Sequence, residues 1–215
     1  MNMKKLIVSL CSALAAFTLT AENTATGSIR MDCNGDLNIT GNGKTAVAQT
    51  VAPQFDNNTA LVFGPKNRVL LPQCNMLKSS AGTLEMRLKS LDWNGSDNTF
   101  KYFFYARKNG GSDVIFMRKN HKGSLEFAIG KLPHDLSVLQ HDISGWGPNE
   151  FHTIKVCWGA SRMVLYVDGK AVAERKYQDK NLVWSDPMWI GGSIWGTSGG
   201  KSALDYFQLS DKADF

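Results

Sequence analysis

The chain has 215 residues, of which 43% are hydrophobic and 20% are charged, and its formal net charge at pH 7 is +5. This length suits a single domain, and the basic residues are scattered among acidic neighbours, which excludes the basic footprint of a nucleic-acid-binding protein. No stretch provides the roughly 20 apolar residues of a transmembrane helix, so we expect no membrane span.

The N-terminus has the pattern of a secretory signal peptide. Lys4 and Lys5 precede an apolar run over residues 6–19, and the small residues Thr20 and Ala21 follow. We expect cleavage after Ala21, which divides the chain into a leader over residues 1–21 and one domain over residues 22–215. The protein is therefore expected to be secreted, or exported to the periplasm or the cell envelope.

Three of the four cysteines follow this leader, at Cys33, Cys74 and Cys157. Disulfides persist in exported proteins, but an odd number of cysteines leaves at least one thiol unpaired within the chain. Cys157 lies in a strand-like run, where we interpret it as a small packing residue. Cys33 and Cys74 lie near the ends of predicted strands, and the sequence leaves their pairing open.

Strand-like segments recur along the chain from residues 28–32 to residues 204–210. In the clearest of them, residues 84–89, leucine or methionine alternates with a charged residue, which is typical of a half-buried antiparallel strand. The intervals between segments are about the 8–12 residues expected of a β-sandwich. No helix of ordinary length is predicted between them.

The strongest hairpin signal lies in the second half of the domain. Residues 153–158 and 163–167 both alternate, and the second run ends at Asp168-Gly169, a pair that suits a tight turn with positive φ. We therefore predict an all-β fold, an antiparallel two-sheet β-sandwich.

Three stretches resemble the laminin-G-like jelly-roll modules of the concanavalin A-like lectin/glucanase superfamily. The central stretch, residues 150–158 and 164–170, is the most specific match. The others are an opening pattern over residues 31–43, 60–64 and 68–72, and a closing pattern over residues 189–192 and 204–210. Cys33 and Met31 depart from the opening pattern, which usually has a glycine and an aromatic residue there. The resemblance implies a concanavalin A-like jelly roll.

Some members of this superfamily are glycanases, so we searched for paired carboxylates. A retaining glycosidase needs two carboxyl groups about 5–5.5 Å apart, which alternate residues of one strand can supply. Glu85 and Glu126 lie in suitable strands without such partners, and the loop serine Ser198 has no histidine after it to complete a triad. We therefore expect no enzymatic activity and name no catalytic residue.

A structural calcium site is a further expectation. Alternation places Asp205 on the same face as Phe207 and Leu209, so that its carboxylate points inward, and a buried charge needs a partner. The resemblance implies a structural Ca²⁺ between the opening loop and the closing strand, which would recruit Asp32 and also Asp36. The alternative is that Asp205 only accepts backbone N–H bonds from a loop.

The six tryptophans offer candidate ligand-binding residues. Exposed aromatic rings stack on the apolar face of a pyranose, while polar neighbours bind its hydroxyls. We assign this role to the four that lie beside Gly, Asn, Ser or Asp in predicted loops, namely Trp93, Trp146, Trp184 and Trp195. The alternative for each is that it caps the core, and Trp158 and Trp189, within strands, are expected to be core residues.

These features favour a non-catalytic binding module that recognises a glycan or cell-surface polysaccharide, or acts in adhesion. The second hypothesis is a scaffold that binds a protein partner through a sheet face or edge. The third is a glycoside hydrolase or polysaccharide lyase. A glycan-array screen separates the first two, and a product assay on the same polysaccharides tests the third.

The leader gives the first testable prediction. Intact-mass analysis of protein recovered outside the cytoplasm should show a chain that begins near residue 22, because a signal peptidase removes the charged and apolar leader. Exported protein that retains Met1 would contradict this prediction.

The calcium hypothesis gives the second. A ligand that binds only the folded state adds about 2.7 kcal/mol at 100 times its dissociation constant, which raises the melting temperature at about 2–4 °C per kcal/mol. The melting temperature should therefore be higher with Ca²⁺ than with EDTA, and Asp205→Asn should remove the difference. Equal melting of the wild type in both buffers would exclude the site.

Overall fold

The computed structural model describes residues 27–41, 44–47, 54–57, 59–64, 68–71, 77–108, 110–184, 188–193 and 200–215. The expected leader, Cys74 and Trp195 lie outside these residues. The described residues form strands and no α-helix, and therefore no helix that could cross a membrane.

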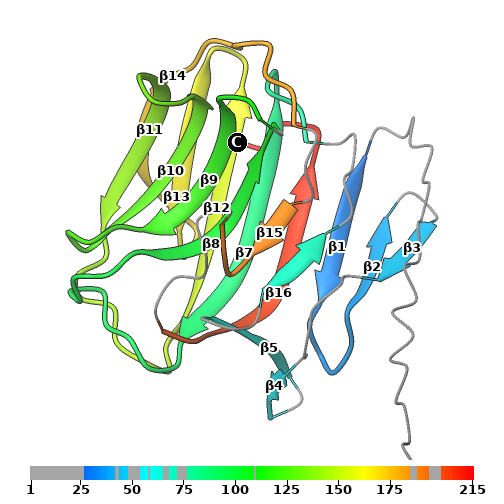
Figure 1. Cartoon of the computed structure of the whole chain (residues 1–215), viewed down its shortest axis with the longest axis vertical. Helices are drawn as coiled ribbons and strands as arrows, with labels where there is room; N and C mark the ends of the chain where they lie inside the picture. The colour runs from blue at the N-terminus through cyan, green and yellow to red at the C-terminus, as the bar shows by residue number, and fades with distance from the viewer. Residues whose placement is uncertain are drawn as a thin grey trace, which may run out of the picture.

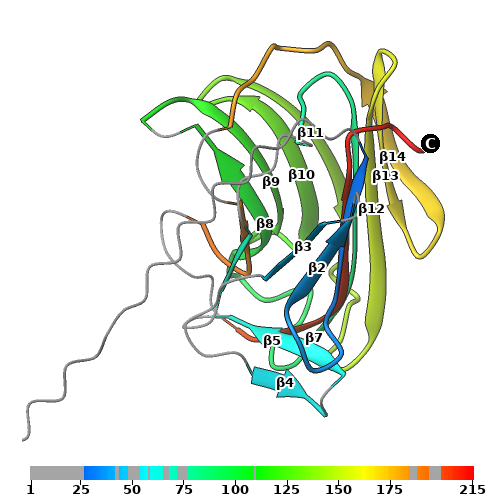
Figure 2. The ribbon, with the colours of Figure 1, turned by 90° about the vertical axis from the view of Figure 1, so that its right-hand side faces the viewer.

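The larger of two sheets has ten strands and forms one layer of the molecule (Figures 1 and 2). All of its strand pairings are antiparallel, and a side branch of two strands joins β16. The main path runs in the order β14 (Lys170–Lys176), β13 (Arg162–Val167), β12 (Phe151–Gly159), β7 (Gly82–Ser90), β16 (Ser202–Ser210), β1 (Ser28–Asp32), β2 (Asn38–Gly41) and β3 (Lys44–Val47), and the branch consists of β5 (Ala60–Phe63) and β4 (Gln54–Asp56).

The smaller sheet has six strands and forms the second layer. Figure 2 shows its long strands curving so that the face turned away from the larger sheet is concave. The order is β11 (Asp135–Asp142), β10 (Ser124–Lys131), β9 (Asp113–Lys119), β8 (Lys101–Arg107), β15 (Met188–Ile190) and β6 (Val69–Leu71), again with antiparallel neighbours. The prediction of an antiparallel two-sheet sandwich is confirmed.

The core lies between the two sheets and follows the alternation seen in the sequence. In β7, the side chains of Leu84, Met86 and Leu88 are fully buried, whereas the charged residues between them are only half-buried. Burying one face of each strand removes apolar surface from water at roughly 25 cal/mol per Å², the main driving force for the sandwich.

The predicted hairpin joins β13 to β14. Asp168 and Gly169 have φ values of +50° and +78°, as a tight primed turn requires. The prediction of this turn from the Asp-Gly pair is confirmed.

Cys33 and Cys157 are both buried and free in the structure. Burial raises the pKa of the Cys33 thiol to about 12, which makes it unreactive at neutral pH. The expectation that Cys157 serves as a small buried residue agrees with its complete burial and with the contact of its thiol to the backbone carbonyl of Asp214.

Trp158 is the largest fully buried side chain of the described core. Its indole stacks on Phe127 with ring centroids 5.7 Å apart, and its Nε1–H donates to the carbonyl of Lys78 at 2.9 Å. Gly82 on the adjacent strand leaves room for this ring, because a Cβ at position 82 would lie 2.2 Å from an indole carbon.

Gly82→Ala should therefore destabilise the fold. Overpacking a filled core costs about 1–3 kcal/mol, and at about 2–4 °C per kcal/mol the melting temperature should fall by about 2–12 °C. Gly145→Ala is the matched control, since nothing lies within 4 Å of a Cβ there. Thermal unfolding followed by circular dichroism measures both variants, and an equal melting temperature for the two would contradict the packing argument.

Candidate functional site

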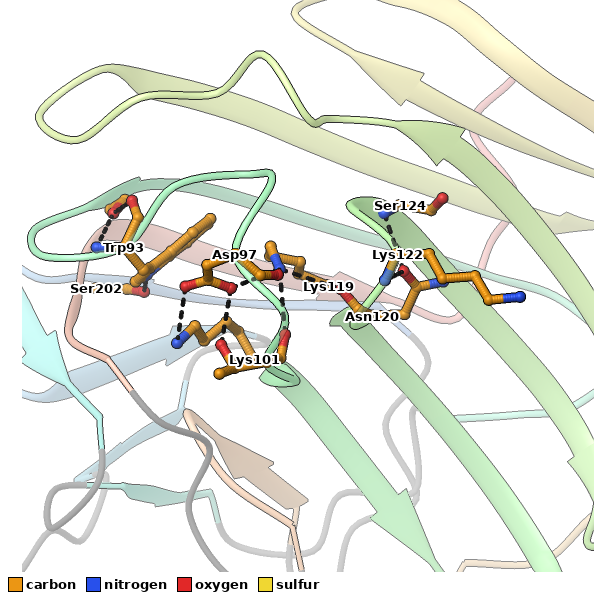
Figure 3. A network of polar contacts seen from close by, with 10 residues as sticks. Trp93, Asp97, Lys101, Lys119, Asn120, Lys122, Ser124 and Ser202 are labelled. Carbon is orange, nitrogen blue, oxygen red and sulfur yellow. Dashed lines mark hydrogen bonds and ion pairs between the residues drawn. The ribbon is translucent and has the colours of Figure 1, made fainter.

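The expected exposure of Trp93 and Trp184 is wrong. Only 2% of Trp93 and 8% of Trp184 is accessible to solvent, and both belong to the core cluster. The indole of Trp93 stacks on Phe103 and donates its Nε1–H to Ser202 Oγ at 2.9 Å (Figure 3). Polar neighbours in the sequence indicated the loops correctly, but these loops turn their indoles inward to close the end of the sandwich.

Trp146 is half-buried, and Trp195 lies outside the described residues. The indole of Trp146 stacks on the imidazole of His152, with ring centroids 3.9 Å apart and an interplanar angle of 7°. His152 Nδ1 in turn lies 2.9 Å from Asp168 Oδ2. One face of the Trp146 ring is therefore covered by the protein itself.

The alternation argument for Asp205 is also wrong. A bulge between Leu204 and Tyr206 leaves Asp205 without a paired residue in β7, so the simple two-residue period does not apply there. Its carboxylate forms an ion pair with Arg87 at 2.5 Å and is one-third exposed.

Asp32, the other predicted calcium ligand, is exposed and pairs with Arg30 at 2.7 Å. The described residues contain no group of three or more His, Cys, Asp or Glu side chains that could hold a metal ion. Asp205 and Asp32 are thus each paired with an arginine, which supplies the positive partner that a buried carboxylate needs. The calcium site stays a prediction.

Lys119, at the end of β9, anchors the loop that precedes β8 (Figure 3). Its side chain is completely buried, and its ammonium donates to Asp97 Oδ1 at 2.7 Å and to the carbonyls of Asp97, Thr99 and Asn120 at 2.6, 3.1 and 3.1 Å. A buried charge is tolerated only when such partners replace water. The loop before β8 is therefore held firmly against the end of the smaller sheet.

Asp97 also lies 3.4 Å from the ammonium of Lys101. Burial alone would raise the pKa of Asp97, but hydrogen bonds from Lys119 and Thr99 and the charges of the two lysines outweigh it, so this pKa lies below its usual range. The carboxylate therefore stays ionised at neutral pH and balances the buried ammonium.

Asn120 connects this anchor to the concave face. Its Oδ1 accepts the backbone N–H groups of Lys122 and Ser124 at 2.8 and 3.0 Å, which fixes the β9–β10 turn. Its Nδ2 donates to Glu126 Oε1 at 2.7 Å.

Four side chains on the concave face form a polar row across β8 to β11. Strand register places Tyr102 opposite Arg118, Arg118 opposite Glu126, and Glu126 opposite Gln140. Arg118 donates to Glu126 Oε2 at 2.7 Å and to the Tyr102 hydroxyl at 3.0 Å, and Gln140 donates to Glu126 Oε1 at 2.7 Å. The polar row is therefore pre-organised.

Aromatic rings surround Arg118. Its guanidinium carbon lies 4.7 Å from the ring centroid of Phe100 and 4.6 Å from that of Phe116. Phe116 is buried, but 39% of Phe100 is accessible to solvent, and Phe100 contacts the exposed His121 at 5.1 Å between centroids. We call Phe100, His121 and the polar row together the aromatic–polar rim.

The concave face continues from the rim as a second apolar cluster, separate from the core. Trp189 belongs to this second cluster and is only 8% accessible to solvent, so the expectation that it is a buried core residue is confirmed. Its buried members are Tyr105, Val114, Phe116, Ala128 and Trp189, and half-buried residues beside them are Leu70, Tyr102, Leu132, Leu136 and Val138.

The rim combines groups that suit the binding of a sugar. An exposed ring beside fixed donors and acceptors can bind both the apolar face and the hydroxyls of a pyranose. Both oxygens of Glu126 are engaged by neighbouring side chains, and the residues opposite it are Arg118 and Gln140. The polar row therefore places no second carboxylate opposite Glu126.

Sequence reasoning missed the polar row of this rim because its four residues lie on four different strands. Alternation shows which face of a strand a residue takes, but only the register of β8, β9, β10 and β11 aligns Tyr102, Arg118, Glu126 and Gln140. One feature of the sequence could have indicated the rim: Phe100 is a large apolar residue that directly precedes a strand.

The comparisons with known proteins bear on the fold and the family. Residues 63–213 match the family model Laminin_G_3, described as the concanavalin A-like lectin/glucanases superfamily. A protein of Arabidopsis thaliana that carries the name xyloglucan endotransglucosylase/hydrolase protein 1 is 23% identical in an alignment 188 residues long, and the match covers 75% of this chain and 63% of that protein.

Solved structures with a similar fold include botulinum neurotoxin binding domains. The receptor binding domain of the C/D mosaic serotype has a TM-score of 0.68 at 9% identity, over 88% of this chain and 49% of that chain. The serotype D ligand binding domain in complex with N-acetylneuraminic acid has a TM-score of 0.66 at 11% identity, over 88% and 48%. The DC binding domain in complex with SialylT has a TM-score of 0.69 at 13% identity, over 87% and 47%.

This chain thus spans about half of each of those structures, and the likeness at such low identity concerns the fold alone. The family model, in contrast, covers most of the chain, and the described strands form the two-sheet sandwich that the resemblance implied. The chain therefore belongs to the concanavalin A-like lectin/glucanases superfamily.

Proposed function

We propose that this protein is an exported, non-catalytic carbohydrate-binding module and that the aromatic–polar rim holds the sugar. The observation that carries the proposal is the exposed Phe100 ring beside the hydrogen-bonded polar row. Arg118 and His121 contact the Phe100 ring, and the part of the ring that stays exposed offers apolar surface to a pyranose, while Gln140 and the Tyr102 hydroxyl offer polar atoms to its hydroxyls.

The hydrogen bonds within the polar row support this role. Binding is weakened when side chains must be ordered by the ligand, but Arg118, Glu126 and Gln140 already hold one another in place. The buried Lys119 holds the loop that leads to Phe100. Little conformational entropy is therefore lost when a sugar binds.

The names of related proteins are consistent with a saccharide ligand. Two of the similar structures are complexes with N-acetylneuraminic acid and SialylT, and the Arabidopsis relative is named for xyloglucan. That relative also raises the alternative of a hydrolase. Both carboxylate oxygens of Glu126 accept hydrogen bonds from neighbouring side chains, which favours binding over catalysis.

Phe100→Ala should weaken glycan binding. Aromatic contacts contribute about 0.5–1.5 kcal/mol beyond burial, so the dissociation constant should rise about two- to twelvefold. A glycan array that includes sialyllactose and xyloglucan oligosaccharides identifies a ligand, and calorimetry with that ligand measures the change.

Phe215→Ala is the matched control, because Phe215 is 37% exposed and lies 4.3 Å from the guanidinium carbon of Arg162 in a similar contact. Its affinity should equal that of the wild type. Equal losses in both variants, or binding to no glycan, would refute the proposal. Release of reducing sugar from the same oligosaccharides would instead support the hydrolase alternative.

A further inference from the structure

A cleft of about 1030 Å³ opens between the free edges of the two sheets. The edge strands β11 and β14 lie side by side there (Figure 1) and contact each other. The β12–β13 turn and the segment that follows β14 complete the walls. The cleft is distinct from the aromatic–polar rim, because the rim lies on the concave face of the smaller sheet.

Three lysines and two aspartates line this cleft, namely Lys131, Lys176, Lys180, Asp135 and Asp179. Lys180 forms an ion pair with Asp135, but Lys131 and Lys176 have no carboxylate partner among the described residues. The lining therefore carries three ammonium groups and two carboxylates, and this excess of positive charge favours a ligand with anionic groups.

The walls of the cleft also present hydroxyl groups and are well fixed. Ser137 and Ser161 line it, and the backbone N–H of Tyr177 donates to the carbonyl of Ser161 at 2.9 Å. The Tyr177 hydroxyl donates to the carbonyl of Ser79 at 2.6 Å, which locks the segment after β14.

The turn in this wall holds an unfavourable backbone. Ala160 and Ser161 have φ values of +47° and +70°, a region that residues with a Cβ adopt at a cost. Both values are those of a tight primed turn, which joins β12 to β13 where Gly159 pairs with Arg162. The turn forms one side of the cleft, and its Ser161 carbonyl accepts the Tyr177 N–H.

The size and chemistry of the cleft define the ligand. Its volume lies at the upper end of the range for small-molecule sites, roughly 300–1,000 Å³, so a simple inorganic anion would not fill it. Serine hydroxyls and lysine ammonium groups suit a ligand that carries both hydroxyls and negative charge. We propose that the cleft is a second binding site, which takes an oligosaccharide bearing carboxylate or sulfate groups.

The test is calorimetry of the purified protein with trigalacturonate and with a neutral galactose trisaccharide. Trigalacturonate should bind and the neutral sugar should not. The double variant Lys131→Gln/Lys176→Gln should weaken binding about two- to twentyfold, because each exposed ammonium–carboxylate pair changes affinity by a factor of about 1.5–5.

The control is Lys108→Gln/Lys170→Gln, which removes the same charge at two exposed lysines outside the cleft. It should bind as the wild type does. A sulfated trisaccharide in a third arm shows which anionic group is preferred, and binding of either anion supports the proposal.

Equal binding by the two double variants, or equal binding of the neutral sugar, would overturn the inference. So would a tetraglutamate peptide that binds as tightly as trigalacturonate, because charge alone would then explain the affinity. The site does not depend on the proposed rim: Phe100→Ala should leave trigalacturonate binding unchanged, so either proposal can fail without the other.

Discussion

The buried ammonium group of Lys119 is the constraint on which the aromatic–polar rim depends. Its partners come from the loop before β8 and from the β9–β10 turn, so one side chain joins these two segments. An unsatisfied charge at this depth would cost several kcal/mol, and the loop therefore cannot move away without a large penalty. Lys119 points between the sheets, whereas its neighbour Arg118 points to the concave face. These two neighbouring residues of β9 thus have separate roles: Lys119 fixes the loop, and Arg118 forms part of the polar row.

The sandwich was predictable because its evidence is local. Alternation in residues 84–89 and 153–158 assigns one face of β7 and β12 to the core, and the Asp168-Gly169 turn fixes a hairpin, whatever the rest of the chain does. Asp205 shows where local reasoning fails. A bulge adds one residue to β16 and ends the two-residue period, and the partner that makes it stable, Arg87, lies 118 positions away in the chain.

The candidate site was beyond prediction for the same reason. Loop composition indicated where Trp93 lies but not which way its ring points, because that direction depends on Ser202 and Phe103 in distant strands. The polar row likewise exists only once β8 to β11 are in register. Residue type alone suggested the proposed class of ligand, since aromatic and polar groups suit sugars, whereas the choice of residues required the three-dimensional structure.

The two proposed sites share strands without sharing a surface, and this follows from the pleat of a β-sheet. In β10 and β11, Glu126 and Gln140 lie at even positions and face the concave side, whereas Lys131 and Ser137 lie at odd positions and face the cleft. Because successive side chains point to opposite faces, a substitution at one site leaves the backbone hydrogen bonds and the other face in place. A rigid sheet packed against a second sheet can therefore carry two ligand sites whose affinities change independently, which a site built on one flexible loop could not do.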